Sequence, residues 1–147
     1  MKIAIASDHR GFTLKEIIIR YLASMGHSVN DLGPDNEQDS VDYPDYGQKV
    51  GKEVAEGRSD KGILICGTGI GMSLAANKVN GVRAALCHDL FTTEMSRRHN
   101  DANVLCLGTD IVNHEIIDNQ IQLWLETEFE NGRHARRVNK IKDLEAL

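Results

Sequence analysis

Short apolar runs alternate with amphipathic stretches along this chain, and that order constrains the fold more than any other feature. Five runs have the length and composition of strands, and they cover residues 3–7, 27–32, 63–66, 82–87 and 104–107. Strands separated by helices form parallel sheets with right-handed crossovers, and the helices cover both faces. We therefore expect an α/β protein of three layers, a doubly wound, Rossmann-like fold around a five-stranded parallel sheet.

Helices are expected between these strands. Apolar residues recur at helical spacing in residues 14–25, 46–54, 90–99 and 111–129. Gly26 is placed to end the first helix in a left-handed conformation, and Pro34 and Pro44 mark residues 33–45 as a surface loop. An apolar stripe in residues 138–147, after a basic stretch, predicts an extra C-terminal helix.

Length and charge narrow the class of protein. A chain of 147 residues matches one ordinary domain, so residues 1–147 are expected to form a single domain. Its 17 basic and 22 acidic residues give a net charge of −5, which argues against nucleic acid or an anionic membrane as a partner. No apolar run is long enough to span a membrane, and Asp8 comes too early for a signal peptide, so a cytoplasmic protein is expected.

The three cysteines are odd in number and lack the paired spacing of metal ligands, so neither a disulfide framework nor a zinc site is indicated, and no cofactor is predicted. Cys66 occupies the last strand position before a glycine loop and a helix, where backbone N–H groups favour a thiolate, and it is a candidate base or nucleophile. Cys87 and Cys106 lie within apolar strands and are interpreted as core residues. A cysteine phosphatase would need an arginine six positions after Cys66, where this chain has Met72.

The glycine loop Gly67-Thr68-Gly69-Ile70-Gly71 can direct several backbone N–H groups at an anion or a developing oxyanion. The spacing fits neither the dinucleotide-binding fingerprint nor a Walker loop, so nucleotide binding is not indicated. A tight turn from strand to helix remains an equally good interpretation of the glycines alone.

Two of the six histidines stand out. His9 follows the first strand beside Asp8, where the carboxyl edge of the sheet binds ligands and a carboxylate can fix the imidazole tautomer. His99, next to Asn100 at a predicted helix end, can act as a general acid or base if it reaches Cys66. Surface or structural roles are expected for the histidines at 27, 88 and 114.

A basic cluster covers residues 133–137 in this otherwise acidic chain. Arg133 and Arg137 are four residues apart and therefore share one helix face, which suits phosphate recognition. A solvated basic helix start is the competing interpretation, and Arg97 and Arg98 are assigned ordinary structural roles.

Five segments together resemble the type B ribose-5-phosphate isomerases: SDHRGF at 7–12, VDYP at 41–44, ILICGTGIGMSLAANK at 63–78, RRHNDANVL at 97–105 and GRH at 132–134. The resemblance extends over nearly the whole chain. It implies a metal-free enzyme that interconverts ribose 5-phosphate and ribulose 5-phosphate, working as a homodimer with active sites shared between subunits.

The resemblance also implies a role for each candidate residue. Cys66 would move the proton between C1 and C2, and His99, with Asp8 and Thr68, would assist furanose opening. The backbone amides of Gly67, Thr68, Gly69, Ile70 and Gly71 would hold the enediolate oxygen. The remaining contacts would be made to the sugar by Tyr43 and Asn100, and to the phosphate by His9, Arg133 and Arg137.

One residue departs from the family pattern. Many relatives have an arginine just after the fifth strand as a further phosphate contact, whereas this chain has Asp110. A carboxylate there would repel phosphate unless it turns away or the phosphate sits differently. An isomerase of a hexose 6-phosphate, such as allose or galactose 6-phosphate, therefore remains an alternative. A second alternative is a non-catalytic sugar-phosphate sensor, which would need the pocket but not Cys66.

Overall fold

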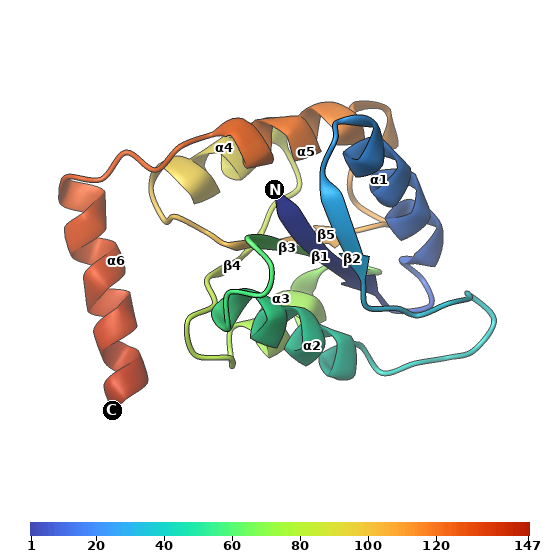
Figure 1. Cartoon of the computed structure of the whole chain (residues 1–147), viewed down its shortest axis with the longest axis horizontal. Coiled ribbons are helices and arrows are strands. Elements are labelled where there is room, and N and C mark those ends of the chain that lie inside the picture. The colour runs from blue at the N-terminus through green and yellow to red at the C-terminus, as the bar shows by residue number, and fades with distance from the viewer.

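A five-stranded parallel sheet in the order β2-β1-β3-β5-β4 forms the centre of the computed structural model, which describes all 147 residues (Figure 1). Its strands are β1 (Lys2–Ser7), β2 (Ser28–Asp31), β3 (Lys61–Cys66), β4 (Ala84–Leu86) and β5 (Val104–Gly108). The inner strands β3 and β5 contain continuous apolar runs because helices cover both of their faces. The expected α/β fold, a doubly wound parallel sheet, is confirmed.

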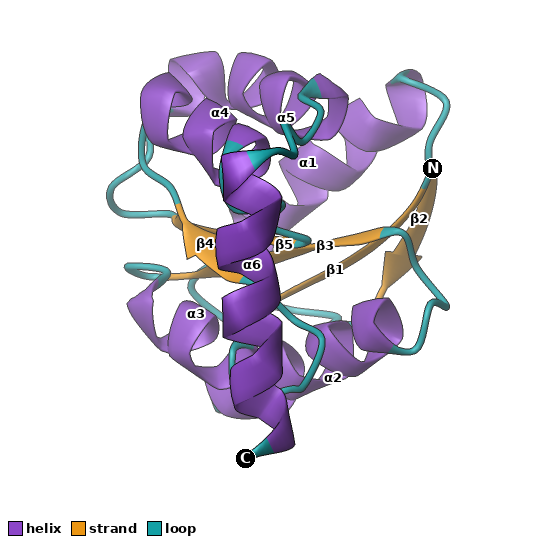
Figure 2. Ribbon diagram, turned by 90° about the vertical axis from the view of Figure 1, so that its left-hand side faces the viewer, coloured by secondary structure: helices purple, strands orange, loops and turns teal.

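Helices on the two faces of the sheet bury nearly all residues of the three inner strands, β1, β3 and β5. The helices are α1 (Phe12–Ser24), α2 (Tyr43–Ala55), α3 (Ile70–Ala76), α4 (Leu90–Arg98), α5 (Ile117–Glu126) and α6 (Arg133–Asp143). In β1, Ile3 and Ile5 pack with α1 and α5, whereas Ala4 and Ala6 pack with α2 and α3. Figure 2 shows the resulting three layers, with α1, α4 and α5 on one face and α2 and α3 on the other.

Three element boundaries differ from the sequence-based expectations. The helix expected at 111–129 is shorter, because Val112 closes a turn on Gly108 and extended backbone at Asn113 precedes a single 3₁₀ turn before α5. The surface loop ends earlier than expected, since α2 already starts at Tyr43 with Pro44 in its first turn, where proline is well tolerated. The fourth strand is limited to Ala84–Leu86.

Helix α6 begins with the basic cluster and runs across the sheet edge formed by β4 (Figure 2). It buries only His134 and Val138, while Ile141 and Leu144 are 44% and 63% exposed. The expected C-terminal helix is therefore present, with much of its apolar stripe uncovered by this chain. None of the helices is both long and apolar enough to cross a membrane.

Candidate active site

The ends of β1, β3 and β5 meet at the carboxyl edge of the sheet. Ser7 pairs with Ile65, and Cys66 pairs with Gly108, so the residues that follow these strands are neighbours. A pocket of about 370 Å³ lies at this edge, and Asp8, Tyr43, Cys66 and Thr68 line it. The sequence analysis expected Asp8, His9 and the glycine loop at this edge; Asp8 and the loop line the pocket together with Tyr43, whereas His9 does not.

Cys66 is held at the base of the glycine loop. Its Sγ accepts a hydrogen bond from the backbone N–H of Gly69 at 3.1 Å, and its side chain is 5% exposed. Gly69 adopts φ +77°, and a Cβ at this position would lie 2.5 Å from Leu86 Cδ1. Only glycine fits this turn, which aims an N–H group at the sulfur.

The amides of the loop divide into two groups. Gly69 donates to Cys66, and Ile70 donates to Thr68 Oγ1 at 3.3 Å. The amides of Gly67, Thr68 and Gly71 donate no hydrogen bond within the chain. Three free N–H groups therefore follow the thiol in the loop, and such groups can hold an oxyanion.

Asp8 and His9 are fixed by backbone groups rather than by each other. Asp8 Oδ1 accepts a hydrogen bond from Gly11 N at 3.0 Å, and His9 Nδ1 accepts one from Val41 N at 3.2 Å. An acceptor Nδ1 leaves the proton of a neutral imidazole on Nε2. The expectation that a carboxylate sets this tautomer is wrong, because the loop N–H of Val41 sets it.

Tyr43 covers the start of α3. A Cβ at Gly71 would lie 2.6 Å from the Tyr43 ring, so the absence of a side chain at Gly71 makes room for the phenol. The ring is 40% exposed and lines the Cys66 pocket, where it can contact a bound molecule.

Asp110 is neutralised within the chain. Its carboxylate forms an ion pair with the guanidinium of Arg10, which lines the Cys66 pocket. The sequence analysis left Arg10 unassigned. Its position within the SDHRGF motif and the unusual carboxylate at 110 were the signals that could have paired the two residues.

The candidates His99, Arg133 and Arg137 lie at the amino edge of the sheet, where the strands begin. His99 ends α4, and the chain then enters β5 at its amino end, whereas Cys66 pairs with the last residue of β5. The five residues of β5 separate these edges by about 13 Å. The pocket around Cys66 is not lined by His99, nor by Arg133 or Arg137 of α6. One chain alone does not bring His99 to the thiol.

His99 stacks on His134 at this amino edge. The ring centroids are 4.1 Å apart with an interplanar angle of 8°, and Glu130 Oε2 lies 3.4 Å from His134 Nε2. Burial, together with the charges of His99 and Arg133, lowers the pKa of His134 below 6.5. The sequence analysis missed His134 because the two stacked rings are 35 positions apart and are joined only in the fold.

His99, Glu130 and His134 are also the one group of side chains that could hold a metal ion, with ligand atoms within 4.8 Å of one another. Arg98 forms an ion pair with Glu130, and Arg133 Nε lies 3.5 Å from His134 Nε2. These guanidiniums occupy the same ligand atoms that a cation would need. A cation would have to displace Arg98 and Arg133 to bind here.

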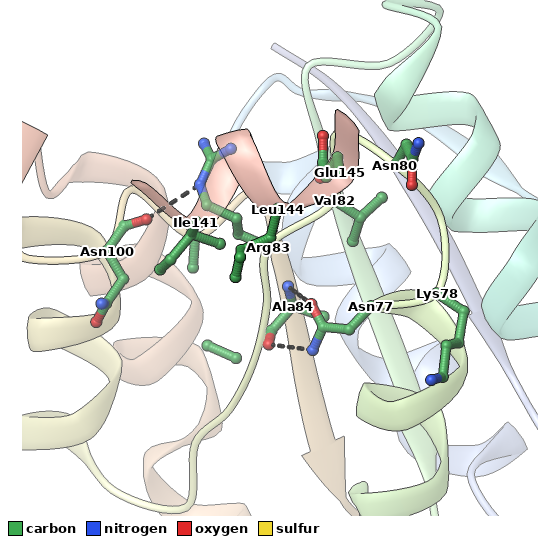
Figure 3. A pocket seen from close by; sticks show the side chains of 12 residues that line it. Asn77, Lys78, Asn80, Val82, Arg83, Ala84, Asn100, Ile141, Leu144 and Glu145 are labelled. Atoms are coloured by element: carbon green, nitrogen blue, oxygen red, sulfur yellow. Dashed lines mark hydrogen bonds between the residues drawn. The ribbon is translucent and has the colours of Figure 1, made fainter. Parts of the chain in front are cut away.

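A second cavity, of about 640 Å³, separates α6 from β4 (Figure 3). Ile141 of α6 and Leu144, which directly follows α6, lie across it from Val82 and Ala84. Asn100 also lines this cavity, and its carbonyl accepts a hydrogen bond from Arg83. Asn100 therefore belongs to the amino-edge group rather than to the Cys66 pocket.

The remaining cysteines and arginines have structural surroundings. Burial raises the pKa of Cys87 and of Cys106, which suits inert core thiols. Arg97 pairs with Asp101 and donates to the carbonyl of Ala102. These contacts agree with the structural roles expected for Cys87, Cys106 and Arg97.

Comparison with known proteins places the chain in one family. The sequence pattern of the family described as Ribose/Galactose Isomerase matches residues 3–141. Ribose-5-phosphate isomerase B of Escherichia coli (strain K12) is 44% identical, covering 98% of this chain and 96% of that protein. D-erythrulose-4-phosphate isomerase of Pectobacterium atrosepticum is 40% identical, covering 96% of this chain and 93% of its own length.

A solved structure gives the same result for the fold. Ribose-5-phosphate isomerase B of Mycoplasma genitalium, with bound ribulose-5-phosphate, superposes with a TM-score of 0.95 at 44% identity. The match covers 99% of this chain and 96% of that one.

Proposed function

The chain belongs to the Ribose/Galactose Isomerase family and is an isomerase of sugar phosphates, and from that membership we propose that it interconverts ribose 5-phosphate and ribulose 5-phosphate with Cys66 as the base. The placement of the Cys66 thiol carries this proposal. Its Sγ accepts from Gly69 N at 3.1 Å and opens onto the pocket at the carboxyl edge. A base beside free backbone amides is what an enediolate intermediate requires.

In the proposed reaction, one hydrogen moves from C2 to C1 and another from O2 to O1. The Cys66 thiolate removes the C2 proton of the open-chain aldose and returns it to C1. The free amides of Gly67 and Thr68 hold the oxygen that becomes negative in the enediolate. Tyr43, which lines the same pocket, contacts the sugar hydroxyls.

Ring opening and phosphate binding complete the proposed cycle. Ribose 5-phosphate is mainly a furanose, so an acid and a base must open it before the C2 proton becomes accessible. We assign this step to His99 with Asp8 and Thr68. His9, together with Arg133 and Arg137, binds the phosphate, which positions the reacting carbon through a remote contact.

This assignment requires two copies of the chain, because His99 and Cys66 lie at opposite sheet edges. We propose a homodimer in which the amino edge of one copy faces the Cys66 pocket of the other. Ile70 and Leu74, which line that pocket, are 50% and 63% exposed. Ile141 of α6 and Leu144, just after α6, are also exposed. Apolar surface of this extent beside a pocket supports a covering subunit.

The pentose is favoured over a hexose 6-phosphate by the bound ribulose-5-phosphate of the related structure. The relative D-erythrulose-4-phosphate isomerase supports some tolerance of sugar chain length within this fold.

The proposed location is the cytoplasm. Its reducing conditions fit the three buried free thiols of the chain.

Turnover assays with ribose 5-phosphate and allose 6-phosphate, in the presence of a chelator, test this proposal. We expect ribose 5-phosphate to be isomerised faster and the chelator to have no effect. If neither sugar is isomerised, the proposed reaction is wrong, and if the chelator abolishes turnover, the metal-free mechanism is wrong.

Cys66→Ala separates an enzyme from a sugar-phosphate sensor. Removing a general base is expected to lower kcat by about 10³-fold while sugar-phosphate binding persists. Cys87→Ala is the matched control, because that thiol is also buried but lies outside the pocket. Unchanged isomerisation in Cys66→Ala would exclude the thiol as the base.

A further inference from the structure

Arg10 lies in a turn that is pressed against the end of β3. Asp8 Oδ1 accepts a hydrogen bond from Gly11 N at 3.0 Å, which closes the turn. A Cβ at Gly11 would lie 2.7 Å from Ile65 Cγ2, so the turn leaves no gap above β3. The starting point of the Arg10 side chain is therefore fixed relative to the catalytic strand.

The Arg10 guanidinium lies against the residue that follows Cys66. A Cβ at Gly67 would lie 2.6 Å from Arg10 Nη1 and 3.2 Å from Asp110 Oδ2. Any larger residue at 67 would displace the guanidinium. The first glycine of the loop thus makes room for a positive charge one residue away from the thiol.

Asp110 anchors this guanidinium from the other side. Its carboxylate accepts from Arg10 Nη2, while its own N–H donates to the carbonyl of Gly67 at 3.0 Å. The preceding N–H, that of Thr109, donates to the carbonyl of Cys66 at 2.9 Å. The backbone of residues 109 and 110 is therefore hydrogen-bonded to the start of the glycine loop, and the Asp110 carboxylate positions Arg10 beside that loop.

The exposure of the pair argues against a purely structural role. The side chains of Arg10 and Asp110 are 56% and 48% exposed, and ion pairs this exposed contribute little to stability. Arg10 donates to no acceptor other than Asp110, so most of its five N–H groups are free. It is the only basic residue that lines the Cys66 pocket.

We propose that Arg10 is a substrate-binding residue whose guanidinium binds the phosphate group of the sugar at the mouth of the Cys66 pocket, and that Asp110 is the positioning residue that holds it there. A guanidinium binds phosphate through parallel N–H groups, and Asp110 occupies only part of the fork. The carboxylate at 110 then assists phosphate binding, since its charge is neutralised by Arg10. This inference rests on the proposed function for the identity of the substrate.

Binding of inorganic phosphate, measured by calorimetry, tests the contact without requiring turnover. Arg10→Gln is expected to weaken phosphate binding about tenfold and to raise KM for ribose 5-phosphate by a similar factor, with kcat within about threefold of the wild type. Arg10→Lys keeps the charge without the fork and should recover part of the loss. Asp110→Asn, which frees the guanidinium, should raise KM by about threefold with little change in kcat.

Arg58→Gln is the matched control, since Arg58 is also about half exposed and paired with glutamates but lies outside the pocket. Unchanged phosphate binding and KM in a folded Arg10→Gln variant would overturn the proposal. So would a loss confined to kcat or to thermal stability. Phosphate binding that depends on Arg10 in a wild type that isomerises neither sugar would refute the proposed function and leave the phosphate contact standing.

Discussion

The two edges of the sheet hold the candidate residues in different ways. At the carboxyl edge, strand ends and backbone N–H groups fix the Cys66 thiol and Asp8, and both side chains are buried. At the amino edge, His99 ends a helix and stacks on His134, while Arg133 and Arg137 project from the exposed start of α6. The first edge is built by backbone geometry and the second by side chains.

The two edges therefore differ in how precisely they position their side chains. The bond-making group must be held within a fraction of an ångström, and buried strand ends supply that precision. In the proposed reaction, His99, Arg133 and Arg137 only have to meet the substrate once two copies of the chain close the site. Substitutions that disturb the buried backbone of the carboxyl edge should therefore harm folding and chemistry together, whereas substitutions of side chains at the amino edge should harm function alone.

The largest expected effect at the amino edge belongs to His99→Asn. Loss of an acid or base for ring opening should lower turnover of ribose 5-phosphate by about 10²–10³-fold without lowering the melting temperature. Erythrose 4-phosphate carries its phosphate on the oxygen that would close a furanose, so its isomerisation should fall by less than about threefold. Equal losses on both sugars would show that His99 does not act in ring opening.

Gly69→Ala tests the carboxyl edge. A methyl group there meets Leu86 and the backbone of Leu107, and alanine must adopt a left-handed conformation. We expect a loss of about 3 kcal/mol in the free energy of unfolding and a fall of about 10²-fold in kcat, as the Gly69 N–H moves away from Cys66. Gly57→Ala has the same backbone strain with open space around it, so it should lose stability alone.

Arg137→Ala should have a smaller effect, restricted to binding. Loss of one charged phosphate contact is expected to raise KM for ribose 5-phosphate about tenfold, while thermal unfolding stays the same. Arg136→Ala is the control, because Arg136 is equally basic and exposed but faces another side of α6. Similar KM values for the two variants would mean that the shared face of Arg133 and Arg137 has no special role.

The smallest effect concerns the stability of the His99–His134 stack at low pH. Burial lowers the pKa of His134 in the folded chain, so the unfolded chain takes up this proton first as the pH falls. The stabilisation is complete above about pH 6.5 and is lost as the pH drops through the lowered pKa. His134→Phe, which keeps a stacking ring, should therefore show a smaller loss of the free energy of unfolding between pH 7 and 5.

Denaturant titrations at several pH values measure this difference. His114→Phe is the control, because His114 is also an imidazole but is exposed and lies outside the stack. An identical pH profile for His134→Phe and the wild type would remove His134 as the cause.

Local patterns in the sequence were sufficient for the fold and for the carboxyl edge. Apolar runs revealed the strands, and the parallel-sheet rule then placed Asp8 beside Cys66. The ion pair of Arg10 with Asp110 and the stack of His99 on His134 join residues 100 and 35 positions apart. Such contacts depend on tertiary packing, which periodicity does not encode.

The shorter α5 shows a similar limit. Apolar spacing continues from Ile111 onward, but the turn from Val112 to Gly108 and the capping side chain of Asn113 delay the helix. The hydrogen bond that Val112 N donates to the carbonyl of Gly108, at the end of β5, competes with the helical pattern there.

The central claim is that each active site takes Cys66 from one copy and His99 from another. Mixing two inactive variants is its most direct test. Cys66→Ala and His99→Asn chains carrying different tags are co-expressed, and the mixed dimers are purified and assayed with ribose 5-phosphate. In a shared arrangement, each mixed dimer has one site with both substitutions and one intact site, so it should recover about half of the wild-type activity. Mixed dimers as inactive as their parents would contradict the account, because both residues of a site would then come from one chain.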